Sequence, residues 1–260
     1  MNDVQKRAHL DVAVDAARKA GALVKSMMEQ GDVRVSEKHM NDFVTNADRA
    51  SETLIISTIK ERFPDESFFG EESGEQERSG NGRWVIDPID GTTNYFHGIP
   101  DWTISIAWEI EPFHPLVGVV YVVLQDELFS AAEGDGARLN GRPVHVSSTD
   151  DHSRAVIVCV PPHRHHDAAP AYFAAEQRIF DGCSDLRSFG SCALELAYIA
   201  CGRLDGYYER FLGYYDLAGG LALLREAGGK LEFLGTHDDT HCDFIASNGK
   251  IHDWLREQVR

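Results

Sequence analysis

The sequence predicts a mixed α/β protein in two halves, and three patterns carry that prediction. Apolar residues recur at helical spacing over residues 3–30 and indicate a long amphipathic helix. Short apolar segments between residues 84 and 146 are separated by turn residues, as in an antiparallel sheet. From about residue 150 strands alternate with helices, which is typical of α/β proteins. We therefore divide the chain into an N-terminal α+β half, residues 1–148, and a C-terminal α/β half, residues 149–260.

The N-terminal half is expected to contain two helices followed by a run of strands. The first helix ends at Gly31-Asp32, and an extended piece follows at residues 33–36. Thr45-Asn-Ala-Asp48 has the form of a capping box, so a second helix is expected from there to Arg62, where Phe63-Pro64 stops it. Residues 74–83 are rich in Gly, Glu and Ser and are expected to form an exposed loop. Strands are predicted at residues 84–86, 103–109, 116–123, 127–132 and 143–146, with a turn-rich hairpin loop at residues 135–141.

The C-terminal half is expected to alternate between strands and helices. Strands are predicted at residues 155–160, 186–189, 204–209, 230–234 and 243–247. Helices are predicted at residues 168–180, 193–201, 217–227 and 249–258. Gly228-Gly229 closes the third of these helices, and Asp216 is expected to precede it.

Composition and charge exclude several classes of function. The chain of 260 residues is 43% apolar and 26% charged, which fits a globular protein with a substantial core. Its net charge of −17 argues against nonspecific nucleic-acid binding and against an anionic membrane surface. The longest apolar run, residues 116–124, is too short to span a bilayer. The five cysteines form no Cys-x-x-Cys pair, which favours reduced thiols and a cytoplasmic location.

Residues 84–94, with the sequence Trp-Val-Ile-Asp-Pro-Ile-Asp-Gly-Thr-Thr-Asn, are the most informative segment. Asp87 and Asp90 offer the hard oxygen ligands that Mg²⁺ prefers, and Pro88 restricts the backbone around Asp87. Gly91 allows close approach to a ligand, and the amides that follow it could open a helix whose N-terminus attracts an anion. The segment could equally be an Asx turn that ends a strand.

Four further acids lie where folding does not require them, at the ends of elements or in loops. They are Asp48, Glu71, Glu209 and Asp216. Each has a structural alternative, since Asp48 and Asp216 could cap helices and Glu71 could be a solvated loop charge. Carboxylates that gather in one place repel one another, so a cluster of them implies a hard divalent cation. A separate run, Pro-Pro-His-Arg-His-His at residues 161–166, could be a solvated loop, a transition-metal site or a contact for an anionic substrate.

Three blocks of sequence closely resemble the inositol monophosphatase family of lithium-sensitive, Mg²⁺-dependent phosphomonoesterases. They are Phe69-Gly-Glu-Glu-Ser-Gly74, the segment from Trp84 to Pro100, and the segment from Asp216 to Gly229. The resemblance covers nearly the whole chain. It implies a layered α-β-α-β-α sandwich of the inositol monophosphatase and fructose-1,6-bisphosphatase type, with the site between the two halves. Relatives are commonly homodimers, so a homodimer is expected here.

The resemblance also implies roles for individual residues. Two or three Mg²⁺ ions would be held by Glu71, Asp87, Asp90, Asp216 and the carbonyl group of Ile89. Asp48 and Thr92 match the pair that orients and deprotonates the attacking water. The substrate would be contacted by Gly91, Thr92, Gly190, Ser191, Cys192 and Glu209.

The function expected from this resemblance is Mg²⁺-dependent hydrolysis of a small polyol or sugar phosphate, with inositol 1-phosphate as the first candidate. Histidinol phosphate, fructose 1,6-bisphosphate and 3′-phosphoadenosine nucleotides are alternative substrates. A non-enzymatic alternative is a regulator that binds the transcription or ribosomal-RNA processing machinery. No membrane partner is expected, and the negative charge disfavours direct binding of nucleic acid.

Overall fold

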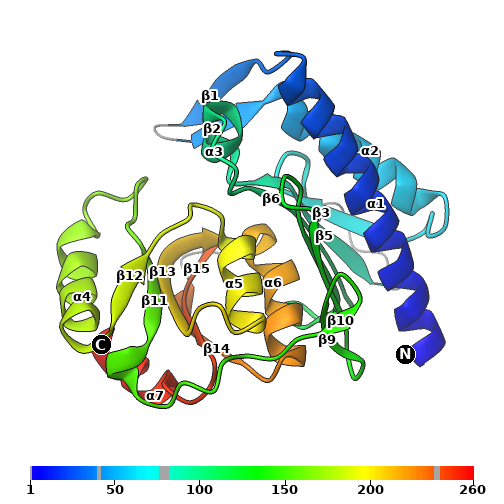
Figure 1. Cartoon of the computed structure of the whole chain (residues 1–260). Coiled ribbons are helices and arrows are strands. Elements are labelled where there is room, and N and C mark those ends of the chain that lie inside the picture. The colour runs from blue at the N-terminus through cyan, green and yellow to red at the C-terminus, as the bar shows by residue number, and fades with distance from the viewer. Residues whose placement is uncertain (1, 40–41, 76–81, 237–240) are drawn as a thin grey trace.

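A long N-terminal helix and a second helix cover one face of a large sheet (Figure 1). The computed structural model describes residues 2–39, 42–75, 82–236 and 241–260. Helix α1 (Asp3–Glu29) is capped by Asn2 and buries a stripe of small residues, which lets the helix lie close to the sheet. Helix α2 (Asn46–Lys60) begins at the expected capping box, in which Thr45 and Asp48 bond each other's backbone N–H groups. Both helices are thus confirmed.

The large sheet has eight strands in the order β10-β9-β8-β7-β6-β5-β3-β4. Every adjacent pair is antiparallel except β3 with β5. Its strands are β3 (Ser67–Gly70), β4 (Gly74–Glu75), β5 (Arg83–Asp90), β6 (Thr103–Glu109), β7 (Pro115–Val122), β8 (Glu127–Ala132), β9 (Gly136–Leu139) and β10 (Arg142–Pro143). A separate hairpin, β1 (Val35–His39) with β2 (Asp42–Thr45), precedes α2.

Three predictions for this half were wrong in detail, and one strand, β3, was missed. The expected hairpin loop at 135–141 contains strand β9, because its backbone pairs with β8 despite its turn-forming residues. The expected strand at 143–146 is reduced to β10. Strand β3 was not predicted, because four buried residues give no alternating pattern. Of the loop expected at 74–83, residues 74 and 75 form β4, and residues 76–81 lie outside the described part of the chain.

Helices α5 (Cys192–Ala200) and α6 (Tyr214–Glu226) form the middle layer between the two sheets. Helix α6 lies directly on the large sheet because both surfaces carry glycine at the crossing. A Cβ atom on Gly118 of β7 would lie 2.5 Å from the carbonyl oxygen of Gly219 in α6. This close approach brings the first turn of α6, which carries Asp216, beside strand β5.

The second sheet has five strands in the order β12-β11-β13-β15-β14. Strands β12 (Asp185–Arg187), β11 (Val156–Val160) and β13 (Gly206–Gly213) are parallel, whereas β15 (His241–Ser247) and β14 (Lys230–Thr236) complete the sheet in antiparallel fashion. Helices α4 (Ala169–Gly182) and α7 (His252–Gln258) cover its outer face. The five layers are therefore α-β-α-β-α, as the resemblance implies.

Three boundaries in this half correct the sequence analysis. Strand β13 extends four residues beyond the predicted end at Glu209, through a β-bulge between Glu209 and Leu212. Helix α6 begins at Tyr214, so Asp216 lies in its first turn and does not precede it. The N-cap of α6 is Gly213, which has no side chain to signal the start. The last helix begins at His252, three residues later than expected.

Among the helices of the described residues, none combines the length and apolar character that crossing a membrane requires.

Candidate functional site

Strand β5 places Asp87 and Asp90 at the edge of a cavity. The strand is buried along its whole length, and its pairing with β6 shifts register between the two aspartates. Pro88 lies inside this bulge, where the absence of an N–H group costs no ladder hydrogen bond. The Ile89 N–H donates to Asp87 Oδ1 at 3.0 Å, and Ser51 Oγ donates to the Pro88 carbonyl at 2.9 Å. The bulge is therefore an Asx turn that fixes the orientation of Asp87 at the cavity edge.

Asp87, Asp90 and Asp216 form a compact group of carboxylates. Each contributes an oxygen atom, and these atoms lie within 4.8 Å of one another. Asp87 is 1% exposed, and its Oδ2 atom is buried without a hydrogen-bond donor among the described residues. A buried carboxylate oxygen with no donor is costly unless a cation meets it. Three hard oxygen ligands at this spacing suit a divalent cation such as Mg²⁺.

The electrostatics of this group also point to a missing positive charge. Burial raises the pKa of Asp87 well above its ordinary value, and the charges of Glu71, Asp216 and Asp90 raise it further. Burial and repulsion by Asp216 raise the pKa of Asp90 to about 8. The pKa values of Asp216 and Glu71 are raised as well, first by burial. Acids gathered in this way hold protons when no cation is bound, and a bound cation would reverse the shift.

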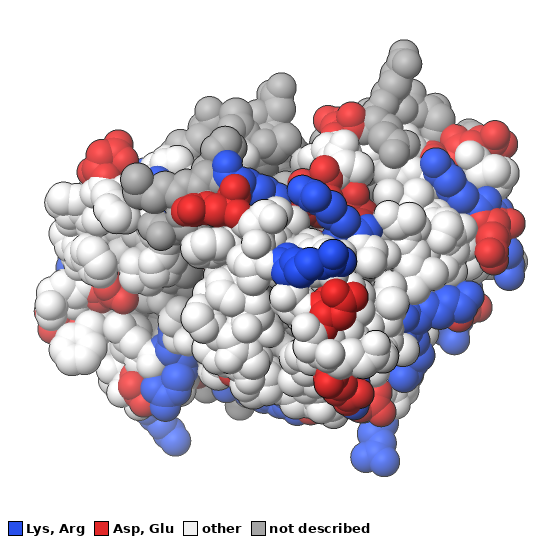
Figure 2. All heavy atoms as spheres, turned by 90° about the horizontal axis from the view of Figure 1, so that it is seen from above, with Lys and Arg blue, Asp and Glu red and all other residues white. Residues whose placement is uncertain are grey.

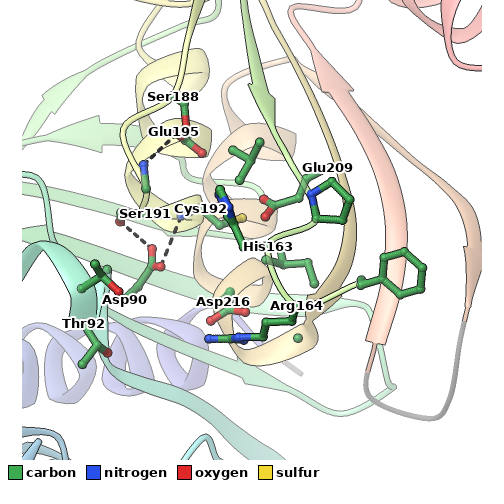
Figure 3. A pocket seen from close by; sticks show the side chains of 18 of the residues that line it. Asp90, Thr92, His163, Arg164, Ser188, Ser191, Cys192, Glu195, Glu209 and Asp216 are labelled. Carbon is green, nitrogen blue, oxygen red and sulfur yellow. Dashed lines mark hydrogen bonds between the residues drawn. The ribbon is translucent and has the colours of Figure 1, made fainter. Parts of the chain in front are cut away.

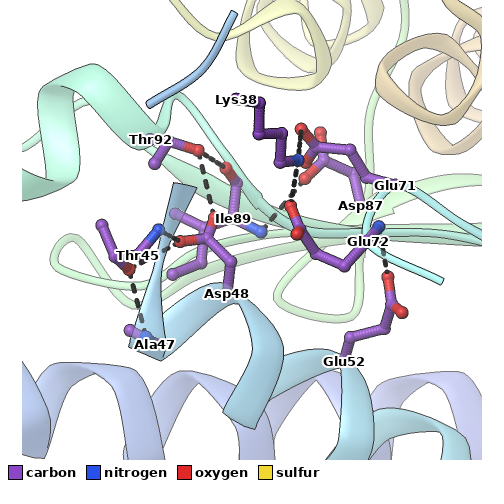
Figure 4. A network of polar contacts seen from close by, with 10 residues as sticks. All are labelled: Lys38, Thr45, Ala47, Asp48, Glu52, Glu71, Glu72, Asp87, Ile89 and Thr92. Atoms are coloured by element: carbon purple, nitrogen blue, oxygen red, sulfur yellow. Dashed lines mark hydrogen bonds and ion pairs between the residues drawn. The ribbon is translucent and has the colours of Figure 1, made fainter. Parts of the chain in front are cut away.

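A second acidic group lies beside the first and contains Asp48, Glu71 and Glu72, whose oxygen atoms also lie within 4.8 Å (Figure 4). Lys38 Nζ lies 3.3 Å from Glu71 Oε1 and also contacts Glu72. The Lys38 ammonium group therefore offsets part of the negative charge. The Glu72 N–H donates in turn to Glu52 Oε2 at 3.0 Å, which fixes the loop that carries both glutamates.

Thr92 and Asp48 form a hydrogen-bonded pair at the start of helix α3 (Thr92–His97). Thr92 Oγ1 lies 3.1 Å from Asp48 Oδ1 and 3.0 Å from the Ile89 carbonyl oxygen, and its one proton can be donated to either. Asp48 Oδ2 accepts from the N–H and hydroxyl groups of Thr45. Burial raises the pKa of Asp48, although the bonds from Thr45 counteract that effect. Asp48 thus completes the capping box of α2 with Thr45 and also orients Thr92.

Gly91 and Gly190 bring the two halves of the chain into close contact. Gly91 has φ +91°, and a Cβ atom there would lie 3.1 Å from the carbonyl oxygens of Asp101 and Gly190. Asn94 Nδ2 donates to the carbonyl groups of Asp101 and Phe189, each at 2.6 Å. The N-cap of α3 is Gly91, which has no side chain to accept from the first N–H groups of the helix, and these groups have no intrahelical partner.

Asp90 ties the strand β5 to helix α5 (Figure 3). Its Oδ2 atom accepts from Ser191 Oγ at 2.6 Å and from the Ala193 N–H at 2.7 Å, and its Oδ1 atom accepts from the Cys192 N–H at 3.2 Å. Asp90 therefore stabilises the N-terminus of α5 and is held in a single orientation. Burial raises the pKa of the Cys192 thiol well above its ordinary value, so Cys192 is a neutral wall residue.

Two glutamates form the far side of the cavity. Glu209 on β13 accepts a hydrogen bond from the Tyr207 hydroxyl group, and burial raises its pKa. Glu195 on α5 accepts from the N–H groups of Phe189 and Gly190, while its Oε2 atom has no donor among the described residues. Burial raises the pKa of Glu195 to about 7. Glu195 therefore fixes the 189–190 turn at the cavity wall.

The residues that the sequence predicts for the site converge on one cavity of about 530 Å³. Asp48 does not line it but supports Thr92 from behind. The predicted residues that line the cavity are Glu71, Asp87, Ile89, Asp90, Gly91, Thr92, Gly190, Ser191, Cys192, Glu209 and Asp216. Residues 161–166 also line it, which places the Pro/His run at the site. The acidic groups that could share an ion among the described residues do not include its histidines.

Sequence reasoning missed four residues of the site: Lys38, Glu72, Asn94 and Glu195. Glu72 and Asn94 each belong to a sequence block that the analysis singled out, but no signal gave either a role. Lys38, Asn94 and Glu195 act through contacts with residues that are distant in sequence or through backbone groups of a turn. No local pattern indicates such contacts.

Comparison with known proteins agrees with the fold. The model of the inositol monophosphatase family matches residues 5–260. The chain is 43% identical over 232 residues to the Nus factor SuhB of Escherichia coli, covering 88% of this chain and 86% of that protein. It is 42% identical to inositol monophosphatase 3 of Solanum lycopersicum, covering 85% and 84%. Among solved structures, the extragenic suppressor protein suhB of Bartonella henselae superposes with a TM-score of 0.90 at 35% identity, covering 97% of this chain and 98% of that one.

The layered fold, with acids from both halves around one cavity, is that of a metal-dependent phosphatase. The chain belongs to the inositol monophosphatase family.

Proposed function

We propose that this protein is a Mg²⁺-dependent phosphomonoesterase that acts on a small polyol or sugar phosphate, with inositol 1-phosphate as the first candidate. The observation that carries the proposal is the group of Asp87, Asp90 and Asp216, in which one buried carboxylate oxygen has no hydrogen-bond donor within the described part of the chain. Membership of the inositol monophosphatase family supports the same reaction class, and a tomato relative is named as an inositol monophosphatase. Lithium inhibition, a cytoplasmic location and a homodimer stay predictions.

The three aspartates and Glu71, with the Ile89 carbonyl group, are the residues that would hold the metal. Bound Mg²⁺ would supply a Lewis acid that neutralises phosphoryl charge and activates water. Asp87 and Asp90 are rigid, because the bulge and the N-terminus of α5 fix them before any ion arrives. Such preorganisation lowers the free-energy cost of assembling a charged site.

Thr92 and Asp48 would orient the attacking water and receive its proton. The Thr92 hydroxyl group can accept from water while it donates to Asp48 Oδ1, so a proton can pass to the carboxylate. The raised pKa of Asp48 makes it a better base than an exposed aspartate. The N–H groups at the start of α3 would bond phosphoryl oxygens, and Gly91 leaves room for that approach.

Phosphate release across a panel of esters tests the proposal. The panel contains inositol 1-phosphate, histidinol phosphate, fructose 1,6-bisphosphate and 3′-phosphoadenosine 5′-phosphate, each with Mg²⁺ and with excess chelator. We expect chelator-sensitive release, fastest with a polyol or sugar phosphate. No release from any ester with Mg²⁺ present would defeat the enzyme hypothesis, whereas a preference for histidinol phosphate would overturn the substrate alone.

A second candidate function is a regulatory contact with the transcription or ribosomal-RNA processing machinery. Its support is the 43% identity to a protein named as a Nus factor. On the face seen in Figure 2, the described Lys and Arg side chains lie among Asp and Glu side chains, which favours a protein partner over nucleic acid. Affinity capture from bacterial lysate tests this candidate, and recovery of no transcription component would count against it.

A further inference from the structure

Two hydroxyl groups on strand β6 are buried without a hydrogen-bond partner among the described residues. They belong to Thr103 and Ser105, which are 0% and 1% exposed. A buried hydroxyl group whose proton meets no acceptor costs free energy, so most such groups in native proteins have a partner. Two of them on one strand, two residues apart, therefore call for an explanation.

Both hydroxyl groups lie on the face of the large sheet that the middle layer covers. Side chains alternate along a strand, and Ile104 and Ile106 of β6 pack with helices α1 and α2 on the outer face. Thr103 and Ser105 therefore face the opposite way, toward the layer that contains helix α6 (Figure 1). The contact with α6 agrees with this direction, since a Cβ atom on Gly219 would lie 2.5 Å from Ser105 Oγ.

The pairing of β5 with β6 places each hydroxyl group beside one of the aspartates that we propose to hold the metal. Ser105 is directly opposite Asp87, and Thr103 is directly opposite Asp90. Residues directly opposite in an antiparallel pair share a face, with Cβ atoms about 4.5–5.5 Å apart. Asp216 lies on α6 one helical turn before the glycine that Ser105 contacts. Ser105 therefore lies between Asp87 and helix α6.

The two aspartates differ in the hydrogen bonds that they already accept. Both oxygen atoms of Asp90 accept from groups at the start of α5. Asp87 Oδ2, in contrast, has no donor within the described part of the chain. Ser105 thus has an unused proton beside a carboxylate with an unused acceptor, whereas Thr103 lies beside a carboxylate whose oxygen atoms are engaged.

We propose that Ser105 is a positioning residue for the metal centre, and that its hydroxyl group donates to Asp87 Oδ2, directly or through one buried water, when a divalent cation is bound. The inference rests on the proposed Mg²⁺-dependent function, and it assigns a role to a residue that does not line the cavity. A carboxylate oxygen has two lone pairs, so Asp87 Oδ2 can meet a cation with one and accept from Ser105 with the other. A hydrogen bond of this kind fixes the orientation of a ligating carboxylate, and its loss lowers metal affinity by about 10–100-fold.

Titration of the Ser105→Ala variant with Mg²⁺ tests this inference without any ester. Isothermal titration calorimetry should give a Kd for Mg²⁺ about tenfold or more above that of the wild type. The unfolding temperature of the metal-free variant should not fall, because the substitution removes a buried hydroxyl group that has no partner. Thr103→Val is the matched control, since it removes the equivalent hydroxyl group beside Asp90, and its Kd should stay within about threefold of the wild type.

An unchanged Kd in Ser105→Ala, or an equal rise in both variants, would overturn the inference. A clearly lower unfolding temperature of metal-free Ser105→Ala would also overturn it, because the hydroxyl group would then stabilise the fold itself. If the wild-type protein binds Mg²⁺ but hydrolyses no ester, the proposed activity fails alone, and the Kd values of the two variants still decide the inference. Failure of the wild-type protein to bind Mg²⁺ would overturn both.

Discussion

Replacing Asp90 with asparagine should lower kcat for any accepted phosphate ester by about 10²–10³-fold, the scale seen when one group that acts in the transition state is lost. The substitution has two effects at the same place. It removes a carboxylate from the group with Asp87 and Asp216, which we propose to hold the metal. It also turns an NH₂ group toward donors, because Asp90 accepts from Ser191 Oγ and from two N–H groups of α5.

The unfolding of this variant separates a lost ligand from a lost fold. Without metal, Asp90 holds a proton near neutral pH, so Asp90→Asn removes no charge there, and the metal-free protein should lose at most about 1–3 kcal/mol, because the NH₂ group meets donors of α5. Mg²⁺ should no longer raise its unfolding temperature as it does for the wild type. Asp15→Asn, at an exposed position on α1, is the matched control and should keep full activity. Activity of Asp90→Asn within about threefold of the wild type would contradict the role that we assign to Asp90.

Replacing Arg83 with methionine should lower the free energy of unfolding by about 3–5 kcal/mol, the usual cost of removing one partner of a buried ion pair. Arg83 is 6% exposed and Glu109 is 1% exposed, and Arg83 Nε donates to Glu109 Oε1 at 2.7 Å. The Tyr214 hydroxyl group donates to the other oxygen of Glu109. The pair therefore joins β5, β6 and the first residue of α6, two residues before Asp216.

Denaturant unfolding of a double variant provides the comparison. Arg83→Met with Glu109→Leu removes both charges and should lose clearly less stability than Arg83→Met alone, because no buried charge is left unpaired. The double variant still loses the acceptor of Tyr214, which costs about 1–3 kcal/mol. A single variant that loses less than about 1 kcal/mol would show that Glu109 is already balanced by other groups.

The sequence predicts the elements whose signals are local and long. Helix α1 has its apolar stripe and α2 its capping box, so both follow from neighbouring residues. Strand β9 does not follow from its neighbours in sequence, because its pairing with β8 overrides its turn-forming residues. The start of α6 does not either, because contact with the large sheet decides it and its glycine N-cap gives no signal. Tertiary contacts decide such boundaries, and a single sequence does not display them.

The candidate site divides in the same way. Asp87 and Asp90 lie in one short motif, and the resemblance supplies partners such as Glu71 and Asp216. Lys38, Asn94 and Glu195 could not be predicted, since their roles depend on residues or backbone groups that the fold brings near them. The Pro/His run at 161–166 was left open in the sequence for the same reason, and only its position over the cavity indicates a role.

The central claim is that buried carboxylates from both halves of the chain need a divalent cation. The pH dependence of the free energy of unfolding, measured with and without Mg²⁺, tests this claim most directly. Burial and repulsion by Asp216 raise the pKa of Asp90 from 3.8 to about 8, so the folded metal-free protein keeps a proton that the unfolded chain loses above about pH 4. The free energy of unfolding in excess chelator should therefore fall as pH rises from about 5 to about 8, by up to ~1.4 kcal/mol per pH unit for each retained proton. Saturating Mg²⁺ should remove most of that fall, so that its stabilising effect grows with pH. Parallel pH profiles in chelator and in Mg²⁺ would contradict the account.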